Sequence, residues 1–279
     1  MGDVVYLCSM AEIMGIINLT EDSFYAASRV KAGEAVERAG AMLEEGADYL
    51  DIGACSSRPG SAQPSEKEEW RRLEGALKAI RKAFPEARLS VDTYRASVVE
   101  RTFDAIGPFL VNDISAGQMD PEMLKTVGGL GLPYVAMHMR GTPETMQQLT
   151  DYPTDITSAV SAYFQDFSHK ADDNGIRDWI LDPGFGFAKT VEQNYQLLMH
   201  MDRLQSFGRP ILVGVSRKSM IYRLLGITPE EALAPTQVVH FKALEKGADI
   251  LRVHDVAEAV RTVRLYSTMY TSSPGAANL

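Results

Sequence analysis

Eight short apolar runs in this chain each end in a polar side chain that could bind a ligand. Some of these residues, in the segments LVNDIS, ILDPG and LSVDT, still lie within apolar sequence, where a buried polar group needs a hydrogen-bonding partner. A flat heterocycle with several N–H and C=O groups would supply such partners, although any one of these residues could instead serve a turn. The run-ending residues are Asn18, Asp51, Asp92, Asn112 with Asp113, His138, Asp182, Ser216 with Arg217, and His254.

A second set of side chains is cationic and follows the ends of the same runs. Clustered cations suggest an anionic ligand, whereas a single Lys or Arg is usually a solvated surface charge. Arg252 is different, because it lies inside an apolar run two residues before His254, and both side chains should face the same side of a strand. An ion pair of Arg252 with Asp249 or Asp255 is the alternative. The cationic set is Arg58, Lys189, Arg217, Lys218, Arg252 and His254.

The apolar runs alternate with longer amphipathic segments, as strands alternate with helices in an α/β protein. The runs are short and mostly β-branched or aromatic, which is typical of buried strands. They span 13–17, 49–52, 89–91, 109–111, 134–137, 179–181, 211–215 and 250–253. Helix signals mark five of the intervening segments, at 33–45, 65–84, 154–174, 190–207 and 229–246. Ser65 and Glu68 have the spacing of a capping box.

Repeated strand–helix units predict a parallel sheet. Eight units in 279 residues favour a closed (β/α)8 TIM barrel, formed as a single domain, over an open doubly wound sheet. In such a barrel the run-ending residues all lie at the C-terminal rim, where the βα loops build active sites. We expect the barrel to span residues 1–270 and residues 271–279 to form a flexible tail.

Composition limits the classes of partner and of compartment. The chain has 28 Lys and Arg against 37 Asp and Glu, a net charge of −9, which argues against nucleic acid or an anionic membrane as the main partner. Its two cysteines, Cys8 and Cys55, cannot form a disulfide scaffold, which favours a reducing compartment. We expect no membrane span and no signal peptide, and therefore a cytoplasmic protein.

Eight motifs resemble, in the same order, those of the dihydropteroate synthase family within the pterin-binding TIM-barrel superfamily. They are MGIINLTEDSF, DIGACSSRPG, SVDTYRASV, VNDISAG, MHMRGTPETMQ, DPGFGFAKT, GVSRKS and LRVHDV. The resemblance implies a transferase of folate biosynthesis that condenses 6-hydroxymethyl-7,8-dihydropterin pyrophosphate with p-aminobenzoate to 7,8-dihydropteroate and pyrophosphate. It also implies an SN1-like route through a pterin cation, Mg2+ as cofactor, sulfonamides as inhibitors, and a homodimer formed by the later helices.

The resemblance assigns roles to the residues that match its motifs. The pterin would contact Asp92, Asn112, Met137, Asp182, Lys218 and Arg252. The pyrophosphate would be held by Asn18, Ser57, Arg58, Arg252 and His254, and Asn18 would also bind Mg2+. The p-aminobenzoate would contact Pro59, Phe187, Lys218 and Ser219. Lys218, Arg252, His254 and Arg58 would act in catalysis, since cations stabilise the negative charge that grows on a departing pyrophosphate.

The chain departs from the family pattern in two loops. In the first, Glu21 replaces a proline, and Ala26, Ala27 and Ser28 replace an acidic residue and two glycines. In the second, Cys55 replaces a glutamate. Two alternative functions share the same barrel. One is a non-catalytic pterin-binding paralogue, and the other is a methyltetrahydrofolate-type methyltransferase domain, which would have no use for the cations as an anion site.

Overall fold

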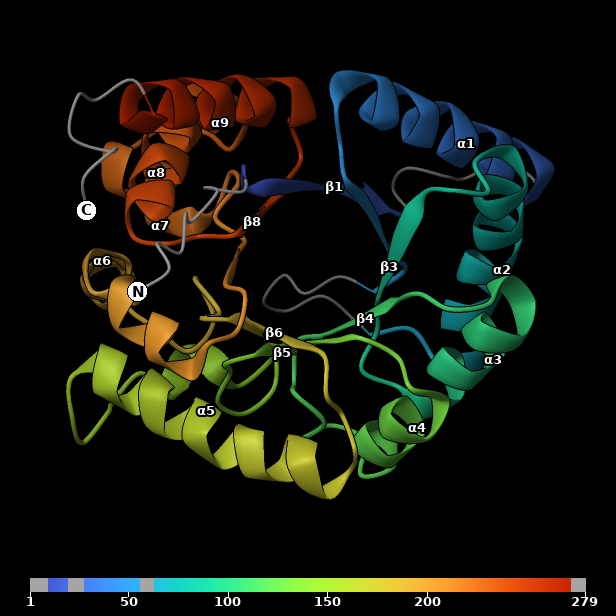
Figure 1. The fold of residues 1–279 in the computed structure, drawn as a ribbon, viewed down its shortest axis with the longest axis horizontal. Helices are drawn as coiled ribbons and strands as arrows, with labels where there is room; N and C mark the ends of the chain where they lie inside the picture. The colour runs from blue at the N-terminus through green and yellow to red at the C-terminus, as the bar shows by residue number, and fades with distance from the viewer. Residues whose placement is uncertain (1–9, 20–27, 56–62, 272–279) are drawn as a thin grey trace, which may run out of the picture.

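Eight parallel strands lie at the centre of the molecule and helices surround them (Figure 1). The computed structural model describes residues 10–19, 28–55 and 63–271. The strands are β1 (Glu12–Asn18), β2 (Tyr49–Gly53), β3 (Arg88–Asp92), β4 (Leu110–Asp113), β5 (Tyr134–Met137), β6 (Trp179–Asp182), β7 (Leu212–Val213) and β8 (Ile250–Val253). They pair in the order β6-β5-β4-β3-β2-β1-β8-β7, and a single bridge between Leu181 and Ile211 joins the two ends. The predicted (β/α)8 barrel is confirmed.

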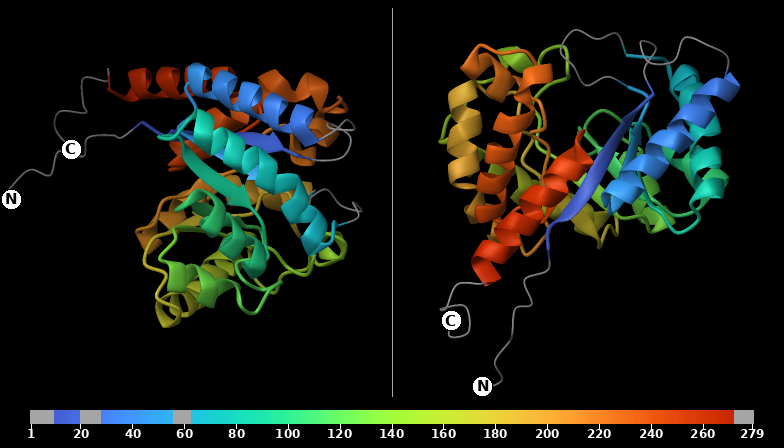
Figure 2. Two further views of the ribbon diagram at one scale, coloured as in Figure 1. Left: turned by 90° about the vertical axis from the view of Figure 1, so that its right-hand side faces the viewer. Right: turned by 90° about the horizontal axis from the view of Figure 1, so that it is seen from above.

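The helices form the outer layer of the barrel. They are α1 (Ser28–Glu45), α2 (Glu66–Ala83), α3 (Ala96–Ile106), α4 (Met123–Leu130), α5 (Ile156–Asp173), α6 (Val191–Met199), α7 (Ser219–Leu225), α8 (Leu233–Glu245) and α9 (Val256–Thr271). Within the described ranges, three short 3-10 helices are η2 (Met146–Gln148), η3 (Met201–Phe207) and η4 (Glu230–Ala232). Helices α1 and α9 lie side by side over β1 (Figure 2). No helix in the described ranges is both long and apolar enough to cross a membrane.

All eight predicted strands are present, and the five predicted helices are present with the following differences. The segment predicted as one helix over 190–207 is divided into α6 and η3, and that over 229–246 into η4 and α8. The capping box predicted at Ser65 is half formed: the Glu68 N–H donates to Ser65 Oγ, but the Glu68 carboxylate binds Arg71 and Arg72 instead of returning to the cap. Helices α3, α4, α7 and α9 were not among the five predicted segments. The predicted tail begins at the last residue of α9, and the rest of it lies outside the described residues.

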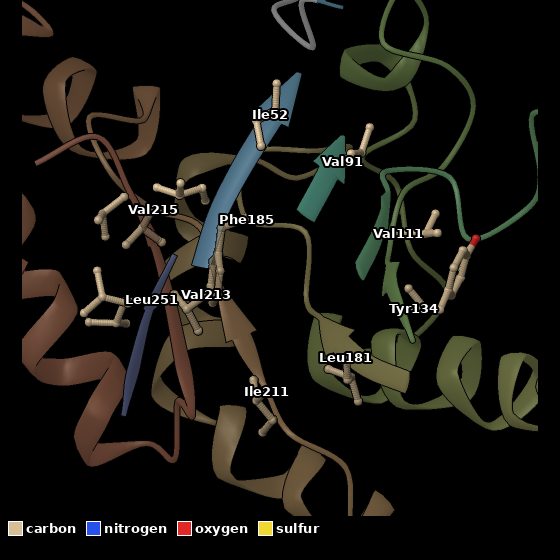
Figure 3. Packing of buried hydrophobic residues seen from close by; sticks show 14 of the residues in the cluster. Ile52, Val91, Val111, Tyr134, Leu181, Phe185, Ile211, Val213, Val215 and Leu251 are labelled. Atoms are coloured by element: carbon tan, nitrogen blue, oxygen red, sulfur yellow. The ribbon is translucent and has the colours of Figure 1, made fainter. Parts of the chain in front are cut away.

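Strand alternation separates two apolar layers. Side chains on the outer face of the strands pack against the helices, and Figure 3 shows several of them, including Ile52, Val91 and Leu181. The alternate side chains face the barrel interior and form an inner cluster. This cluster contains Met14, Leu110, Val135, Ile180, Leu212 and Ile250. The next inward position along several strands is polar, so the alternation that fills the core also sets the position of the site.

Candidate functional site

The candidate site is formed by inward-facing residues at the C-terminal ends of the strands. On four strands, each site residue lies two positions beyond an apolar residue of the inner cluster, and therefore on the same face. The four are Asn112 on β4, Met137 on β5, Asp182 on β6 and Arg252 on β8. Asp92 pairs with Asn112 in the register between β3 and β4, and Met137 pairs with Asp182 between β5 and β6. The structure thus brings five of the predicted pterin-contacting residues to one end of the barrel.

A buried carboxylate organises one side of this site. Asp51 is fully buried, and its side chain accepts hydrogen bonds from Ser90 Oγ at 2.5 Å, Asn112 Nδ2 at 3.1 Å and Arg252 Nε at 2.6 Å. Arg252 Nη2 also donates to Asp92 Oδ2 at 2.8 Å. The guanidinium of Arg252 therefore bridges the carboxylates of Asp51 and Asp92 on neighbouring strands. These contacts hold it at the C-terminal end of the barrel.

The partners of Arg252 differ from the alternative considered from the sequence. Neither Asp249 nor Asp255 pairs with it: Asp249 accepts the Ile211 N–H at 2.8 Å, and Asp255 binds Arg217 through both carboxylate oxygens at 2.8 and 2.9 Å. The sequence identifies Asp51 as a run-ending residue and predicts no specific role for it. Only the fold brings it to Arg252, because the two are 201 positions apart in the chain.

The charges at this end of the barrel perturb one another. Burial raises the pKa of Asp92 to about 7, although the nearby Arg252 opposes the rise. The pKa of Arg252 is itself raised, because the attraction of Asp51 and Asp92 outweighs the effect of burial. Burial raises the pKa of Asp182 too, opposed by Lys218. A site whose buried carboxylates have raised pKa values is suited to binding a neutral ring through shared hydrogen bonds.

The other side of the site consists of loop residues that follow β6 and β7. Lys218 Nζ donates to the Phe185 carbonyl oxygen at 2.5 Å and lies 4.7 Å from the centre of the Phe187 ring. Burial lowers the pKa of Lys218 to about 8, while Asp182 opposes the shift. Phe187 and Met137 belong to one small buried cluster, and Ser219 is the half-buried first residue of α7. The predicted p-aminobenzoate residues Phe187 and Lys218 are thus in contact.

Two predicted pyrophosphate ligands lie at the end of β1 and after β8. Asn18 is exposed at the last position of β1. The His254 main-chain N–H donates to Ser216 Oγ at 3.2 Å, and its ring Nδ1 lies 3.0 Å from the same oxygen. Among the described residues, no three His, Cys, Asp or Glu side chains form a metal-binding group. The exposed amide of Asn18 offers an oxygen donor of the kind that Mg2+ accepts beside phosphate and water ligands, so this residue fits the predicted ion.

Two cations expected at the rim are used elsewhere. Arg217 binds Asp255 and donates to the carbonyls of Pro229 and Glu230, which fixes the loop before α8. Lys189 is 4 % exposed, and the hydrogen-bond partners of its Nζ are His138 Nδ1 and the carbonyl oxygens of Gly184 and Phe187. The clustering of six cations suggested an anionic ligand, but in the structure these two side chains bind protein groups. A strand-end position in the sequence does not determine which way a long side chain points.

Several predicted residues fall outside the described part of the chain. These are Ser57, Arg58 and Pro59 of the second loop and Glu21, Ala26 and Ala27 of the first. Cys55, just before the second of these segments, is half-buried, and burial raises the pKa of its thiol, as expected for an inert side chain rather than a nucleophile.

Comparison with known proteins agrees with this geometry. Residues 14–254 match the family described as "Pterin binding enzyme". The chain is 38% identical to the dihydropteroate synthase of Escherichia coli K12 over 260 residues, covering 92% of this chain and 91% of that protein. It is 40% identical to the Haemophilus influenzae dihydropteroate synthase over 252 residues, covering 89% and 90% of the two chains.

Solved structures show the same similarity. The Yersinia pestis dihydropteroate synthase, in complex with a sulfonamide drug, superposes with a TM-score of 0.88 at 37% identity, covering 95% of this chain and 96% of that one. The Xanthomonas albilineans dihydropteroate synthase with 4-aminobenzoic acid gives a TM-score of 0.85 at 35% identity, covering 95% of each chain. The fold and the site define a pterin-binding enzyme. Within that class, the chain belongs to the dihydropteroate synthase family.

Proposed function

We propose that this protein condenses 6-hydroxymethyl-7,8-dihydropterin pyrophosphate with p-aminobenzoate, giving 7,8-dihydropteroate and pyrophosphate for folate biosynthesis. The observation that carries the proposal is the convergence of Asp92, Asn112, Asp182, Lys218 and Arg252 at one end of the barrel. Carboxylate and amide acceptors there match the N–H edge of a pterin, while the cations match its pyrophosphate.

The pterin is held by the strand residues. Asp182 accepts hydrogen bonds from the aminopyrimidine edge, and Asp92 and Asn112 bind the opposite side of the ring. Arg252, held by Asp51 and Asp92, stacks on the ring face, and Met137 packs against it. Because these side chains are fixed before substrate arrives, little conformational entropy is lost on binding.

The leaving pyrophosphate is stabilised by cations at the rim. Arg252 and His254 meet the growing negative charge, with Ser57 and Arg58 from the second loop. Asn18 would hold Mg2+, which neutralises charge on the pyrophosphate oxygens when it is bound. The C–O bond breaks in an SN1-like step, which leaves a pterin cation whose charge spreads over the ring.

The p-aminobenzoate enters beside Phe187, Lys218, Ser219 and Pro59. Its amine is neutral near pH 7 and forms the C–N bond to the methylene of the pterin cation. The nitrogen then releases one proton to solvent, so the reaction requires no strong general base. Its carboxylate is attracted to the cations of this rim, and its ring packs against Phe187. Catalysis then comes from holding the two substrates in line and from stabilising the leaving group.

The test is release of pyrophosphate by the purified protein. We expect release only when pterin pyrophosphate, p-aminobenzoate and Mg2+ are all present, together with formation of dihydropteroate. Arg252→Gln should abolish this release, whereas Arg101→Gln, which removes an exposed arginine on α3, should leave it unchanged. No release by the wild-type protein under these conditions would contradict the proposal.

Two further measurements separate the alternatives. Complementation of a folate auxotroph that lacks its own synthase would eliminate the non-catalytic paralogue. Competition of inorganic pyrophosphate with pterin pyrophosphate would count against the methyltransferase domain, which has no pyrophosphate to bind.

The proposal extends to a cytoplasmic homodimer, with residues 1–270 as one barrel domain. Helices α7, α8 and α9 lie together on one side of the barrel (Figure 1). Their apolar side chains are 52% to 72% exposed at Leu224, Leu225, Val238, Leu265 and Met269. Such a patch on a soluble barrel is typical of a subunit interface. Sedimentation equilibrium of the wild type and of Val238→Glu tests this, and a wild-type monomer at micromolar concentration would contradict it.

A further inference from the structure

A buried lysine connects the loop after β6 to the end of β5. Lys189 Nζ lies 2.9 Å from His138 Nδ1, and it donates to the carbonyl oxygens of Gly184 at 2.9 Å and Phe187 at 3.0 Å. Three protein groups therefore surround the Lys189 amine within hydrogen-bond distance, and burial lowers the pKa of Lys189 well below its ordinary value. Both Lys189 and His138 are at most 4% exposed. Lys189 is therefore enclosed by protein and does not reach the substrates.

The loop that Lys189 holds carries much of one side of the site. The Gly184 N–H donates to Asp182 Oδ1 at 2.8 Å, and the Phe185 carbonyl accepts from Lys218 at 2.5 Å. Phe187, at the end of this loop, places its ring next to Lys218. Two of the three acceptors of Lys189 are main-chain carbonyls within this same loop, so its bonds set the loop's path.

The third acceptor ties this loop to a rigid part of the barrel. His138 continues the β5–β6 ladder through its N–H, which donates to the Asp182 carbonyl at 2.9 Å. Its ring lies edge-on to Tyr163, with the ring centres 4.9 Å apart. Burial and the neighbouring Lys189 lower the pKa of His138 well below its ordinary value, so the ring is neutral and Nδ1 is able to accept.

We propose that Lys189 and His138 are positioning residues that fix the loop after β6 and, through it, Phe187 and the carbonyl that holds Lys218. This inference rests on the proposed function, since these loop groups form the p-aminobenzoate side of the site. Asp182 stands on a strand and keeps its place through the ladder. Loss of the contacts between Lys189, His138 and this loop therefore weakens the binding of p-aminobenzoate more than that of the pterin.

The first test replaces Lys189 with methionine, which keeps the length of the side chain and removes its donors. In Lys189→Met, hydrogen exchange of the amides at 184–188 should rise at least tenfold, while that of 179–182 on β6 stays within threefold. The KM for p-aminobenzoate should rise at least tenfold, and the KM for pterin pyrophosphate less than threefold. Lys125→Met, at an exposed lysine of α4, is the matched control and should equal the wild type.

The second test uses two nearly isosteric replacements of the histidine. Both His138→Asn and His138→Leu remove the ring, but only asparagine keeps an acceptor near Nδ1. The KM for p-aminobenzoate should be at least fivefold lower in the asparagine variant. The two His138 variants also test the proposal if Lys189→Met does not fold.

Three outcomes would overturn the inference. They are unchanged exchange at 184–188, an unchanged KM for p-aminobenzoate in folded variants, or a fall in kcat alone with both KM values constant, which is the signature of a smaller folded fraction. A wild-type protein that released no pyrophosphate would refute the proposed function, and this inference with it. In that case the hydrogen-exchange measurement would still show whether Lys189 and His138 fix the loop at 184–188.

Discussion

The two sides of the candidate site are held in place by different means. On the pterin side, Asp92, Asn112 and Arg252 stand on strands and are joined to one another through the buried Asp51. On the p-aminobenzoate side, Phe187 and Lys218 stand in loops and are held by main-chain carbonyls and by Lys189. The strand side depends on ion pairs whose partners are far apart in the sequence. The loop side depends on local backbone geometry. Substitutions on the two sides should therefore have different effects on stability and on substrate binding.

The largest expected effect is on the strand side, at the Arg252–Asp51 pair. Arg252→Gln leaves Asp51 buried without its cation, which should lower the free energy of unfolding by about 3–5 kcal/mol. Adding Asp51→Asn removes the uncompensated charge and should recover most of that loss. Urea denaturation of the wild type, both single variants and the double variant measures the coupling.

Across these four proteins, the affinity for pterin pyrophosphate should not change in parallel with the free energy of unfolding. Binding of pterin pyrophosphate should be weaker by about 100-fold in Arg252→Gln and stay weak in the double variant, because the ring and the anion lose their contact in both; this corresponds to about 2.8 kcal/mol. If binding recovered together with stability, Arg252 would be a structural ion-pair partner only, and the comparison between the two sides would lose its basis.

A matched pair of glycines compares the two sides by steric means. A Cβ at Gly184, in the loop, would lie 2.0 Å from the His138 carbonyl oxygen, at a φ of +69°. A Cβ at Gly53, on β2, would lie 3.1 Å from Asp92 Cβ. Gly184→Ala should therefore cost about 3 kcal/mol and Gly53→Ala about 1 kcal/mol.

The kinetic effects of these two substitutions should separate as well. Gly184→Ala should raise the KM for p-aminobenzoate, and Gly53→Ala that for pterin pyrophosphate, each in a steady-state pyrophosphate assay. The same KM rising in both variants would mean that the two sides move as one unit.

Sequence reasoning reached the strand side because strands have a simple period. Side chains two positions apart share a face, so a polar residue within or directly after a buried run predicts an inward-facing group, as at Asn112, Asp182 and Arg252. The same rule could not supply the partner of Arg252, since strand order and register bring Asp51 to it. Asp249 and Asp255 were nearer in sequence, but they bind elsewhere.

The loop side was less predictable for a physical reason. Lys189 and Arg217 follow strands as the site cations do, yet one is buried and the other pairs with Asp255. A long flexible side chain can point in several directions from the same backbone position, and only tertiary contacts decide between them. The lysine of DPGFGFAKT follows Phe187 and Ala188, and these apolar residues could have suggested a buried side chain, because apolar neighbours disfavour an exposed charge.

The two sides should also differ in the pH dependence of their contribution to stability. Asp92, whose ordinary pKa is 3.8, has its pKa raised to about 7 in the folded protein, so ionisation costs stability as the pH rises from about 4 to 7. Lys218 has its pKa lowered from 10.5 to about 8, so its stability cost is relieved as the pH rises from about 8 to 10.5. The two groups thus act in separate windows and with opposite slopes.

Two variants isolate these windows. Relative to the wild type, Asp92→Asn should gain about 3 kcal/mol of stability between pH 4.5 and pH 7.5, and Lys218→Met should lose about 2 kcal/mol of its relative stability between pH 8 and pH 10. Chemical denaturation across the pH range measures both differences, and other titrating groups cancel in the comparison. A flat difference for Asp92→Asn would mean that Arg252 offsets the burial of Asp92 completely. The charges on the strand side would then be fully paired. Of the two sides, only the loop side would contain a buried charge, on Lys218, that lowers stability.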